Sequence, residues 1–298
     1  MLARAALATE QVIGPGGQPR TRVSVLRSKA PLVLRPTIQK GPEPRAGGGS
    51  HVARVSVASG AAGPLGGDQL VLDVDVGAGS TLVLNEISAT LLLPGARGGR
   101  SRMQINIRVG DDATLVWLPE PLIAAQGCDH LEDVRVELDP AGRLLMREEL
   151  LLGRAGEAPG SISQHIRVRR GGKPLFNQQL DLGTASSGGD SPAVIGPHRA
   201  LGSVLVVDPD WEDNPIRSRP FAPDAALLPL SGPAVMVSTV AEDSLRLRRN
   251  LDQGMELLGA PWSPPARQQQ RSGAQQDAVA DGHGLGDDTI PTQIAAVR

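Results

Sequence analysis

The chain has 298 residues, with 30 basic and 32 acidic side chains, and its formal net charge at pH 7 is −2. This near-neutral balance gives no electrostatic reason to expect binding to nucleic acid or to an anionic membrane surface. Aromatic residues make up 2% of the sequence and tyrosine is absent, so stacking platforms for bases or sugar rings are practically excluded. The core must therefore be built from Val, Leu, Ile and Ala.

The sequence carries no signal for a membrane or an oxidising compartment. Cys128 is the single cysteine, so no internal disulfide can form and a reducing cytoplasm is the simpler interpretation. The first ten residues, MLARAALATE, lack the long apolar segment of a secretory signal. No apolar run approaches the roughly 20 residues that a membrane span needs. We expect a soluble, cytoplasmic protein.

Alternating apolar and polar residues, punctuated by Gly and Pro, predict strands through most of the chain. The clearest is 69–76, QLVLDVDV, in which four aliphatic side chains share one face while Asp73 and Asp75 share the other. The same reasoning predicts strands at 22–27, 30–34, 51–58, 81–84, 87–93, 103–109, 114–118, 134–138, 143–152, 162–169, 174–182, 204–207 and 234–240. The fold class is therefore mainly β.

Turn residues predict two hairpins. The sequence DPAG at 139–142 would join 134–138 to 143–152, and Gly171-Gly172 would join 162–169 to 174–182. The segment 183–199 is long and polar, and a loop of that length in a compact domain is usually functional or disordered. We expect it to be a candidate for contact with another protein.

One helix is predicted near the end of the folded region. Thr239 and Glu242 match a capping box, and Gly259 would end the helix. Four apolar side chains recur between them at helical spacing: Leu247, Leu251, Met255 and Leu258. They are candidates for binding a partner protein, and the alternative is that they pack on their own sheet.

The composition changes after the helix and predicts two regions. Residues 1–260 are expected to form a single β-rich domain. Residues 261–298 form a Pro/Gln/Gly-rich tail, which is expected to be disordered because it cannot bury enough apolar surface to offset its ordering entropy.

No catalytic motif of a hydrolase, metalloprotease or nucleotide-binding loop is present in the sequence. Cys128 and His130 stand two residues apart, so in a strand they would face the same way and could share a soft metal ion. The alternative is a small buried thiol near a surface histidine.

Acidic residues are the other candidates. Asp73 and Asp75 share a strand face, Glu148 and Glu149 lie on opposite faces of 143–152, and Glu86 flanks an apolar run. Either they lie on solvated outer faces, or they line a water-filled interior path. An inward glutamate needs water, a cation or an arginine, because burying an unpaired carboxylate costs several kcal/mol. Arg143 and Arg147 are the neighbouring candidates for that arginine.

Five segments of the sequence together form an ordered set of motifs: GGDQLVLDVDVGAGSTLVLNEISAT at 66–90, ATLVWLPEPLI at 113–123, RLLMREELLLGR at 143–154, GKPLFNQQLDL at 172–182 and ALGSVLVV at 200–207. In this order they resemble the urease accessory proteins of the UreD (also UreH) family. The chain departs from the family pattern at Val116, where many members carry an acidic residue, and at Leu91 and Leu92, which replace a lysine and an aromatic residue.

The resemblance implies a β-helix-like stack of many short strands, with one or two helices near the C-terminus. It implies a non-enzymatic maturation chaperone that binds apo-urease subunits and UreF, and through UreF the GTPase UreG. No cofactor would be bound permanently, and Ni²⁺ would pass transiently along an internal passage toward urease. The candidate residues for that passage are Asp73, Asp75, Glu86, Glu148, Glu149, Cys128 and His130.

Two rival interpretations are less well supported. A β-stack enzyme acting on polysaccharide would need sugar-stacking aromatics and a matched pair of carboxylates, and neither can be located in the sequence. A self-assembling structural β protein is the third interpretation.

Overall fold

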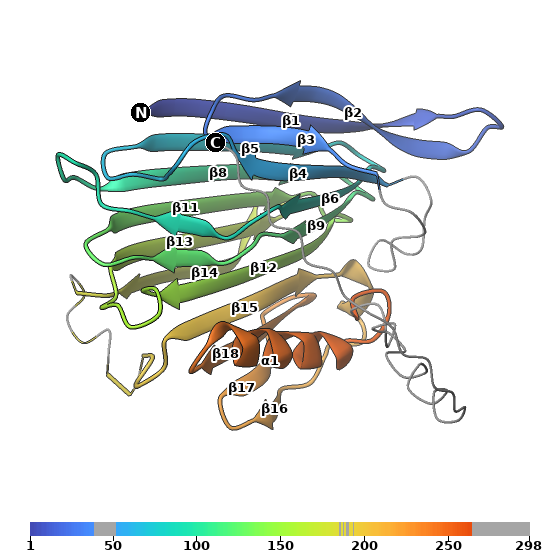
Figure 1. The fold of residues 1–298 in the computed structure, drawn as a ribbon. Coiled ribbons are helices and arrows are strands. Elements are labelled where there is room, and N and C mark those ends of the chain that lie inside the picture. The colour runs from blue at the N-terminus through green and yellow to red at the C-terminus, as the bar shows by residue number, and fades with distance from the viewer. Residues whose placement is uncertain (39–51, 185, 187, 189–190, 193, 264–298) are drawn as a thin grey trace, which may run out of the picture. The chain divides into compact units, whose positions relative to one another are not determined.

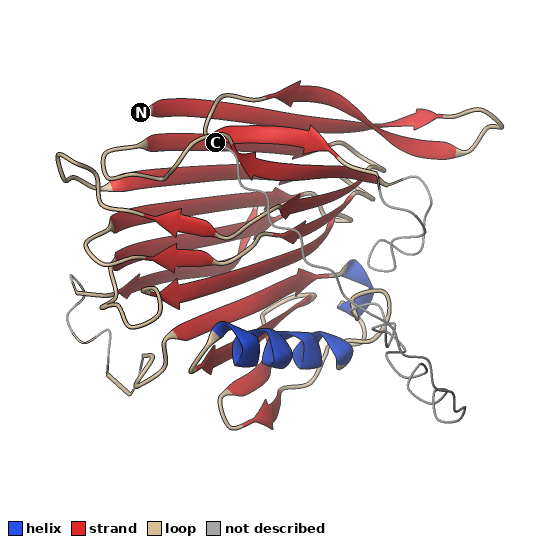
Figure 2. Ribbon diagram, in the orientation of Figure 1, coloured by secondary structure: helices blue, strands red, loops and turns tan. Residues whose placement is uncertain are grey.

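Two β-sheets packed face to face form most of the structure (Figures 1 and 2). The computed structural model describes residues 1–38, 52–184, 186, 188, 191, 192 and 194–263. Sheet A has, in spatial order, β14 (Lys173–Leu182), β13 (Ser161–Arg170), β11 (Asp129–Leu138), β8 (Ser101–Val109), β5 (Gln69–Val76), β1 (Leu2–Ile13) and β2 (Pro19–Arg27).

Sheet B is larger and includes two short side strands. Its spatial order is β16 (Arg219–Ala222), β17 (Ala225–Pro229), β18 (Ala234–Ala241), β15 (Ala200–Val207), β12 (Arg143–Leu152), β9 (Thr114–Leu118), β6 (Thr81–Glu86), β4 (Ala53–Ser59) and β3 (Leu32–Pro36). Beside this path, β10 (Leu122–Ala124) pairs with β12 and with β7 (Thr90–Leu92).

The chain builds this arrangement by crossing repeatedly from one sheet to the other. Strands β5, β8, β11 and β13 are parallel neighbours in sheet A, and β4, β6, β9 and β12 are parallel neighbours in sheet B. Each circuit of the chain therefore adds one strand to each sheet. The prediction of a mainly β, β-helix-like stack is confirmed.

An aliphatic core fills the space between the two sheets. Period-two alternation places Leu72 and Ile105 of sheet A, and Leu82 and Leu115 of sheet B, in one cluster of buried side chains. These residues are at most 4% exposed. Because each strand contributes only one face, the polar residues between them point outward from the stack.

The predicted hairpin at 139–142 is wrong, although the turn itself forms. Gly142 donates its backbone N–H to the carbonyl of Asp139, but β11 belongs to sheet A and β12 to sheet B. The turn residues specify a change of direction and do not specify which strand the returning chain will pair with. The second hairpin is confirmed, since β13 and β14 pair antiparallel across Gly171-Gly172.

Strand β1 was not predicted from the sequence, because the first two inward positions of the strand are alanines. Ala3, Ala5 and Leu7 alternate inward and are fully or almost fully buried. Alanine is a weak indicator of strand, since its preference depends on the neighbours that cover it. Pairing with β5 on one side and β2 on the other supplies those neighbours.

The predicted helix is present as α1 (Ser244–Glu256), but its cap differs from the prediction. Thr239 lies inside β18, so it cannot begin the helix. Asp243 is the N-cap, and its carboxylate accepts a 2.7 Å hydrogen bond from the backbone N–H of Arg246. The helix ends at Glu256, before Gly259.

Helix α1 packs against the outer face of sheet B (Figure 1). The four side chains predicted to bind a partner, Leu247, Leu251, Met255 and Leu258, are at most 8% exposed and join a cluster with β15 and β18. The alternative interpretation, packing on their own sheet, is therefore what the structure shows. They leave no surface for another protein, and a partner of α1 would have to use its opposite face.

Packing continues beyond the predicted domain boundary at residue 260. Trp262 is 1% exposed, and its indole Nε1 donates a 2.7 Å hydrogen bond to Asp208. The rest of the predicted tail, from 264 to 298, lies outside the described residues, as do five residues of the predicted loop 183–199. Within the described ranges, no helix is both long enough and apolar enough to cross a bilayer.

A carboxyl-lined cavity between the sheets

Two neighbouring strands of sheet B are interrupted at the same level. Strand β9 pairs with residues 143–146 of β12, and its continuation β10 pairs with residues 150–152. Pro119 and Pro121 lie in the break, where their missing N–H groups prevent a continuous ladder. The break between β6 and β7 lies alongside, because β6 pairs with β9 and β7 with β10.

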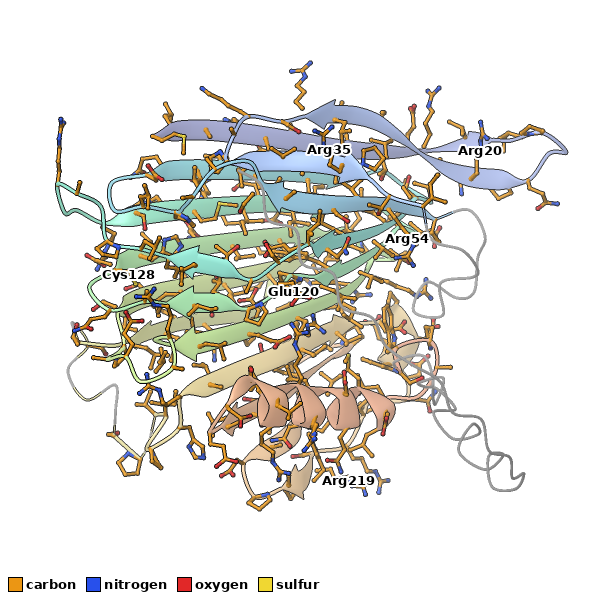
Figure 3. All side chains as sticks on the ribbon, viewed as in Figure 1. Arg20, Arg35, Arg54, Glu120, Cys128 and Arg219 are labelled. Carbon is orange, nitrogen blue, oxygen red and sulfur yellow. The ribbon has the colours of Figure 1, made fainter. Side chains whose placement is uncertain are left out.

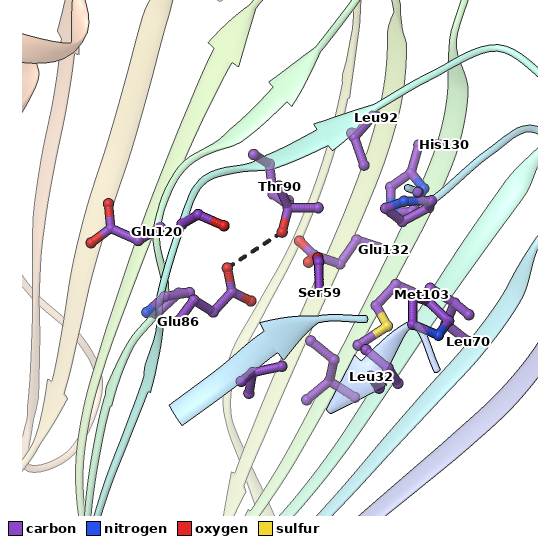
Figure 4. Close-up of a pocket in the computed structure, with 18 of the residues that line it drawn as sticks. Leu32, Ser59, Leu70, Glu86, Thr90, Leu92, Met103, Glu120, His130 and Glu132 are labelled. Atoms are coloured by element: carbon purple, nitrogen blue, oxygen red, sulfur yellow. Dashed lines mark hydrogen bonds between the residues drawn. The ribbon is translucent and has the colours of Figure 1, made fainter. Parts of the chain in front are cut away.

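A cavity of about 70 Å³ lies behind this interruption (Figure 4). That volume has room for several water molecules. Carboxyl groups reach it from both sheets: Glu86 from β6, Glu132 from β11 and Glu148 from β12. No Lys or Arg occurs among the described residues that line it.

Gln164 of β13 joins two of these carboxyl groups. Its side-chain N–H donates a 2.6 Å hydrogen bond to Glu132 and also contacts Glu148. Glu132 is opposite Gln164 in the β11–β13 register, whereas Glu148 comes from the facing sheet. One neutral amide therefore connects the two sheets and brings two carboxyl groups close together.

Burial raises the pKa of each cavity carboxyl group and so favours its protonated form. Desolvation, followed by the charge of Glu132, raises the pKa of Glu86 to about 8, although Thr90 donates a weak 3.4 Å hydrogen bond to it. Desolvation raises the pKa of Glu132, and it raises that of Glu148 well above the ordinary value, with a further contribution from the charge of Glu132. At neutral pH Glu86 is therefore mostly protonated, and an entering cation would have to displace that proton.

A second acidic pair lies on the other side of β12, beneath α1. The Glu149 side chain has no exposed surface, because Arg147 and Arg248 cover it, with N–O distances of 3.0 and 2.9 Å. Arg248 also reaches Glu120, at 2.5 Å. Both glutamates border the cavity, and Figure 3 labels Glu120 near the middle of the front sheet.

These placements correct the expectation for Glu148 and Glu149. They do lie on opposite faces of β12, but the inner one, Glu148, lines the cavity, and α1 covers the outer one. Arg147 is the counter-ion of Glu149 and not of the inward Glu148. Arg143 pairs instead with Asp208 and Asp210, at 3.2 and 3.0 Å.

Cys128 and His130 are both buried, but in different surroundings. His130 lines the cavity, its Nδ1 is 2.8 Å from the Ser101 hydroxyl, and desolvation lowers its pKa to about 4. Cys128 packs in an apolar cluster with Leu92, and desolvation raises the pKa of its thiol to about 11. Cys128 is thus the small buried thiol of the alternative interpretation, whereas His130 is not at the surface.

The structure places Asp73 and Asp75 on the outer face of sheet A, away from the cavity. Asp73 pairs with Arg4 at 2.6 Å and accepts a 2.9 Å hydrogen bond from Asn106. Asp75 is exposed. Across the part of the chain with described coordinates, no group of three or more His, Cys, Asp or Glu side chains is arranged to hold a metal ion, so every predicted nickel contact stays a prediction.

Three residues of the site were not predicted from the sequence: Glu132, Gln164 and Arg248 as a partner of the glutamates. For the first two a signal was present. The inward alternation of β11 extends back from Val134 through Glu132, and in β13 it passes through Gln164. No local pattern could have paired Arg248 with Glu149, which lies 99 positions earlier in the chain.

Comparison of the sequence with known proteins identifies the family of the chain. A sequence profile described as "UreD urease accessory protein" matches residues 3–272. The chain is 40% identical over 261 residues to the urease accessory protein UreD of Streptomyces avermitilis, covering 87% of this chain and 100% of that protein. It is 42% identical over 247 residues to UreD 3 of Streptomyces griseus, covering 82% and 93%. The chain belongs to the UreD family of urease accessory proteins.

Proposed function

We propose that this chain is a non-enzymatic scaffold for urease maturation, which works in the cytoplasm and holds apo-urease together with UreF, and through UreF the GTPase UreG. Membership of the family and the names of its relatives support a role in urease maturation. The presence of a single cysteine is compatible with a reducing compartment.

The cavity supports a second part of the proposal, namely that Ni²⁺ is cargo that passes between the sheets. Glu86, Glu132 and Glu148 offer oxygen ligands without the closed His/Cys cage that would retain a transition metal. An ion entering the cavity must displace protons from these groups, so protein–ion attraction is offset by deprotonation and binding stays weak. Weak binding suits an ion that must leave again.

The single observation that carries the proposal is this acid-lined cavity between the two sheets, with no Lys or Arg among the lining residues that the structure describes. A purely structural stack would gain stability from an apolar filling at the same positions, because unpaired buried carboxyl groups are costly. Their retention inside an otherwise aliphatic core is best explained by a cationic cargo.

Co-expression with urease subunits and UreF tests the scaffold role. We expect affinity-tagged chain to recover both partners from the lysate, and an unrelated β protein carrying the same tag to recover neither. Recovery of neither partner by this chain would contradict the proposal. Urease purified from cells with and without the chain is then compared for nickel by elemental analysis, and equal nickel content would contradict the cargo role.

A further inference from the structure

Arg248 lies at the point where the interruption of sheet B meets α1. Its guanidinium forms ion pairs with Glu149 of β12 and with Glu120, which lies between the two prolines of the β9–β10 break. These two glutamates line the cavity, whereas Arg248 does not. The arginine is thus outside the cavity and holds the two carboxylates on its rim.

Exposure shows which of these groups reach solvent. The side chain of Arg248 is 38% exposed, that of Glu120 is 30% exposed, and that of Glu149 is fully buried. The guanidinium therefore neutralises the partly exposed carboxylate of Glu120 at the rim, while the cavity behind it is lined by carboxyl groups. A cation that approaches from this side meets a carboxylate that is already paired with a guanidinium.

The second arginine of this network has a different position. Arg147 is 13% exposed, is fixed to the break by a 3.2 Å hydrogen bond from its Nη2 to the carbonyl of Pro119, and lies on the sheet itself. Arg248 is carried by a separate element and reaches the rim only through its side chain. A change of side-chain rotamer can release Arg248 without moving the sheet.

We propose that Arg248 is a charge gate: paired with Glu120 and Glu149 it denies cations the rim of the cavity, and on release it frees the carboxylate of Glu120 at the opening and leaves Glu149 paired with Arg147 alone. The inference rests on the proposed passage of a cation, and it identifies the residue that controls entry or exit. Arg248 acts through the two glutamates and is a positioning residue, since it does not itself line the cavity.

Thiol labelling inside the cavity tests the gate on the full chain, with neither nickel nor urease present. Met103→Cys places a thiol on the cavity wall, and the chain without this change serves as the blank for the buried Cys128. The quantity measured is the labelling rate by cationic 2-aminoethyl methanethiosulfonate divided by the rate for neutral methyl methanethiosulfonate. This ratio reports charge selection, and a general loosening of the structure would raise both rates alike.

We expect Arg248→Gln to raise the ratio by about tenfold, which is the lower end of the effect of a charged cleft on the local concentration of ions. Arg249→Gln is the matched control, because it removes the same charge from an exposed neighbouring position of α1. The labelling ratio of Arg249→Gln is expected to stay within about twofold of the ratio measured when both arginines are unchanged. Equal ratios for the two variants would overturn the proposal.

Glu120→Gln provides an independent test if Arg248→Gln does not fold, as judged by circular dichroism. It leaves Arg248 beside Glu149 with one negative charge fewer, so a charge gate predicts a lower ratio, whereas a purely steric plug predicts that both rates rise. An unchanged ratio, or an equal rise in both rates, would overturn the proposal. If the ratios change as expected but urease is not recovered with the chain, the gate stands and the scaffold role fails.

Discussion

Glu148 and Glu149 are consecutive residues of β12 whose carboxyl groups have opposite electrostatic environments. Glu149 is buried with two arginines, so its charge is compensated. Glu148 faces Gln164 and two other carboxyl groups, and desolvation raises its pKa well above the ordinary value. Strand geometry alone separates them, because neighbouring side chains point to opposite faces. Only the inward residue is suited to exchange a proton for a cation.

Replacing Glu148 tests that assignment. We expect Glu148→Ala to leave recovery of urease and UreF unchanged, because the residue lies inside the stack, and to reduce the nickel content of co-expressed urease several-fold. Elemental analysis of the purified urease measures this. Asp75→Ala removes a carboxylate from the exposed outer face and should leave nickel content unchanged. A full nickel complement with Glu148→Ala would contradict a role for Glu148 in the passage.

Helix α1 joins the cavity rim to the outer face of sheet B. Its buried face packs on β15 and β18 through Leu247, Leu251 and Met255, while Arg248 extends from its side toward the rim. Close packing requires Gly202 at the contact, where an added Cβ would lie 3.2 Å from Leu251 and 2.8 Å from the backbone carbonyl of Glu148. The helix position, and hence the reach of Arg248, therefore depends on apolar packing against this strand.

Substitutions at two leucines of α1 distinguish how much side-chain packing and how much helix propensity contribute to the free energy of unfolding. Leu251→Ala should lower the free energy of unfolding by about 2–5 kcal/mol, because it leaves a cavity under the helix. Leu245→Ala makes the same chemical change at a position that is 60% exposed, and should change it by about 0.5 kcal/mol or less. Urea denaturation followed by circular dichroism measures both. Equal losses would show that α1 does not depend on its buried face.

The whole stack encloses three carboxyl groups whose raised pKa values link its stability to pH. The folded state retains protons that the unfolded chain releases above about pH 4.5, the ordinary pKa of a glutamate. The folded state is therefore favoured most below that pH, and the advantage is lost as the pH rises toward the folded-state pKa, which for Glu86 is about 8. One unit of pKa shift corresponds to about 1.4 kcal/mol.

We expect the slope of the free energy of unfolding against pH, between about pH 5 and pH 8, to be more negative in the unmodified chain than in Glu86→Gln, because the amide does not titrate. Urea denaturation at several pH values measures the slope. Asp75→Asn, on the outer face of sheet A, should leave it unchanged. Identical slopes for the Glu86 variant and the unmodified chain would mean that Glu86 is already ionised in the folded protein.

Local alternation and turn residues were sufficient to predict most strands, helix α1, the mainly β class and, through ordered motifs, the family. They could place Glu148 and Glu149 on opposite faces because period two is a property of any strand. They could not show that β11 and β12 belong to different sheets, or that Glu86, Glu132 and Glu148 meet in one cavity. These contacts depend on which strands pair in each sheet and on where the hydrogen-bond ladder of sheet B is interrupted. Pairing between distant segments does not affect the periodicity of either segment, so the periodicity cannot reveal it.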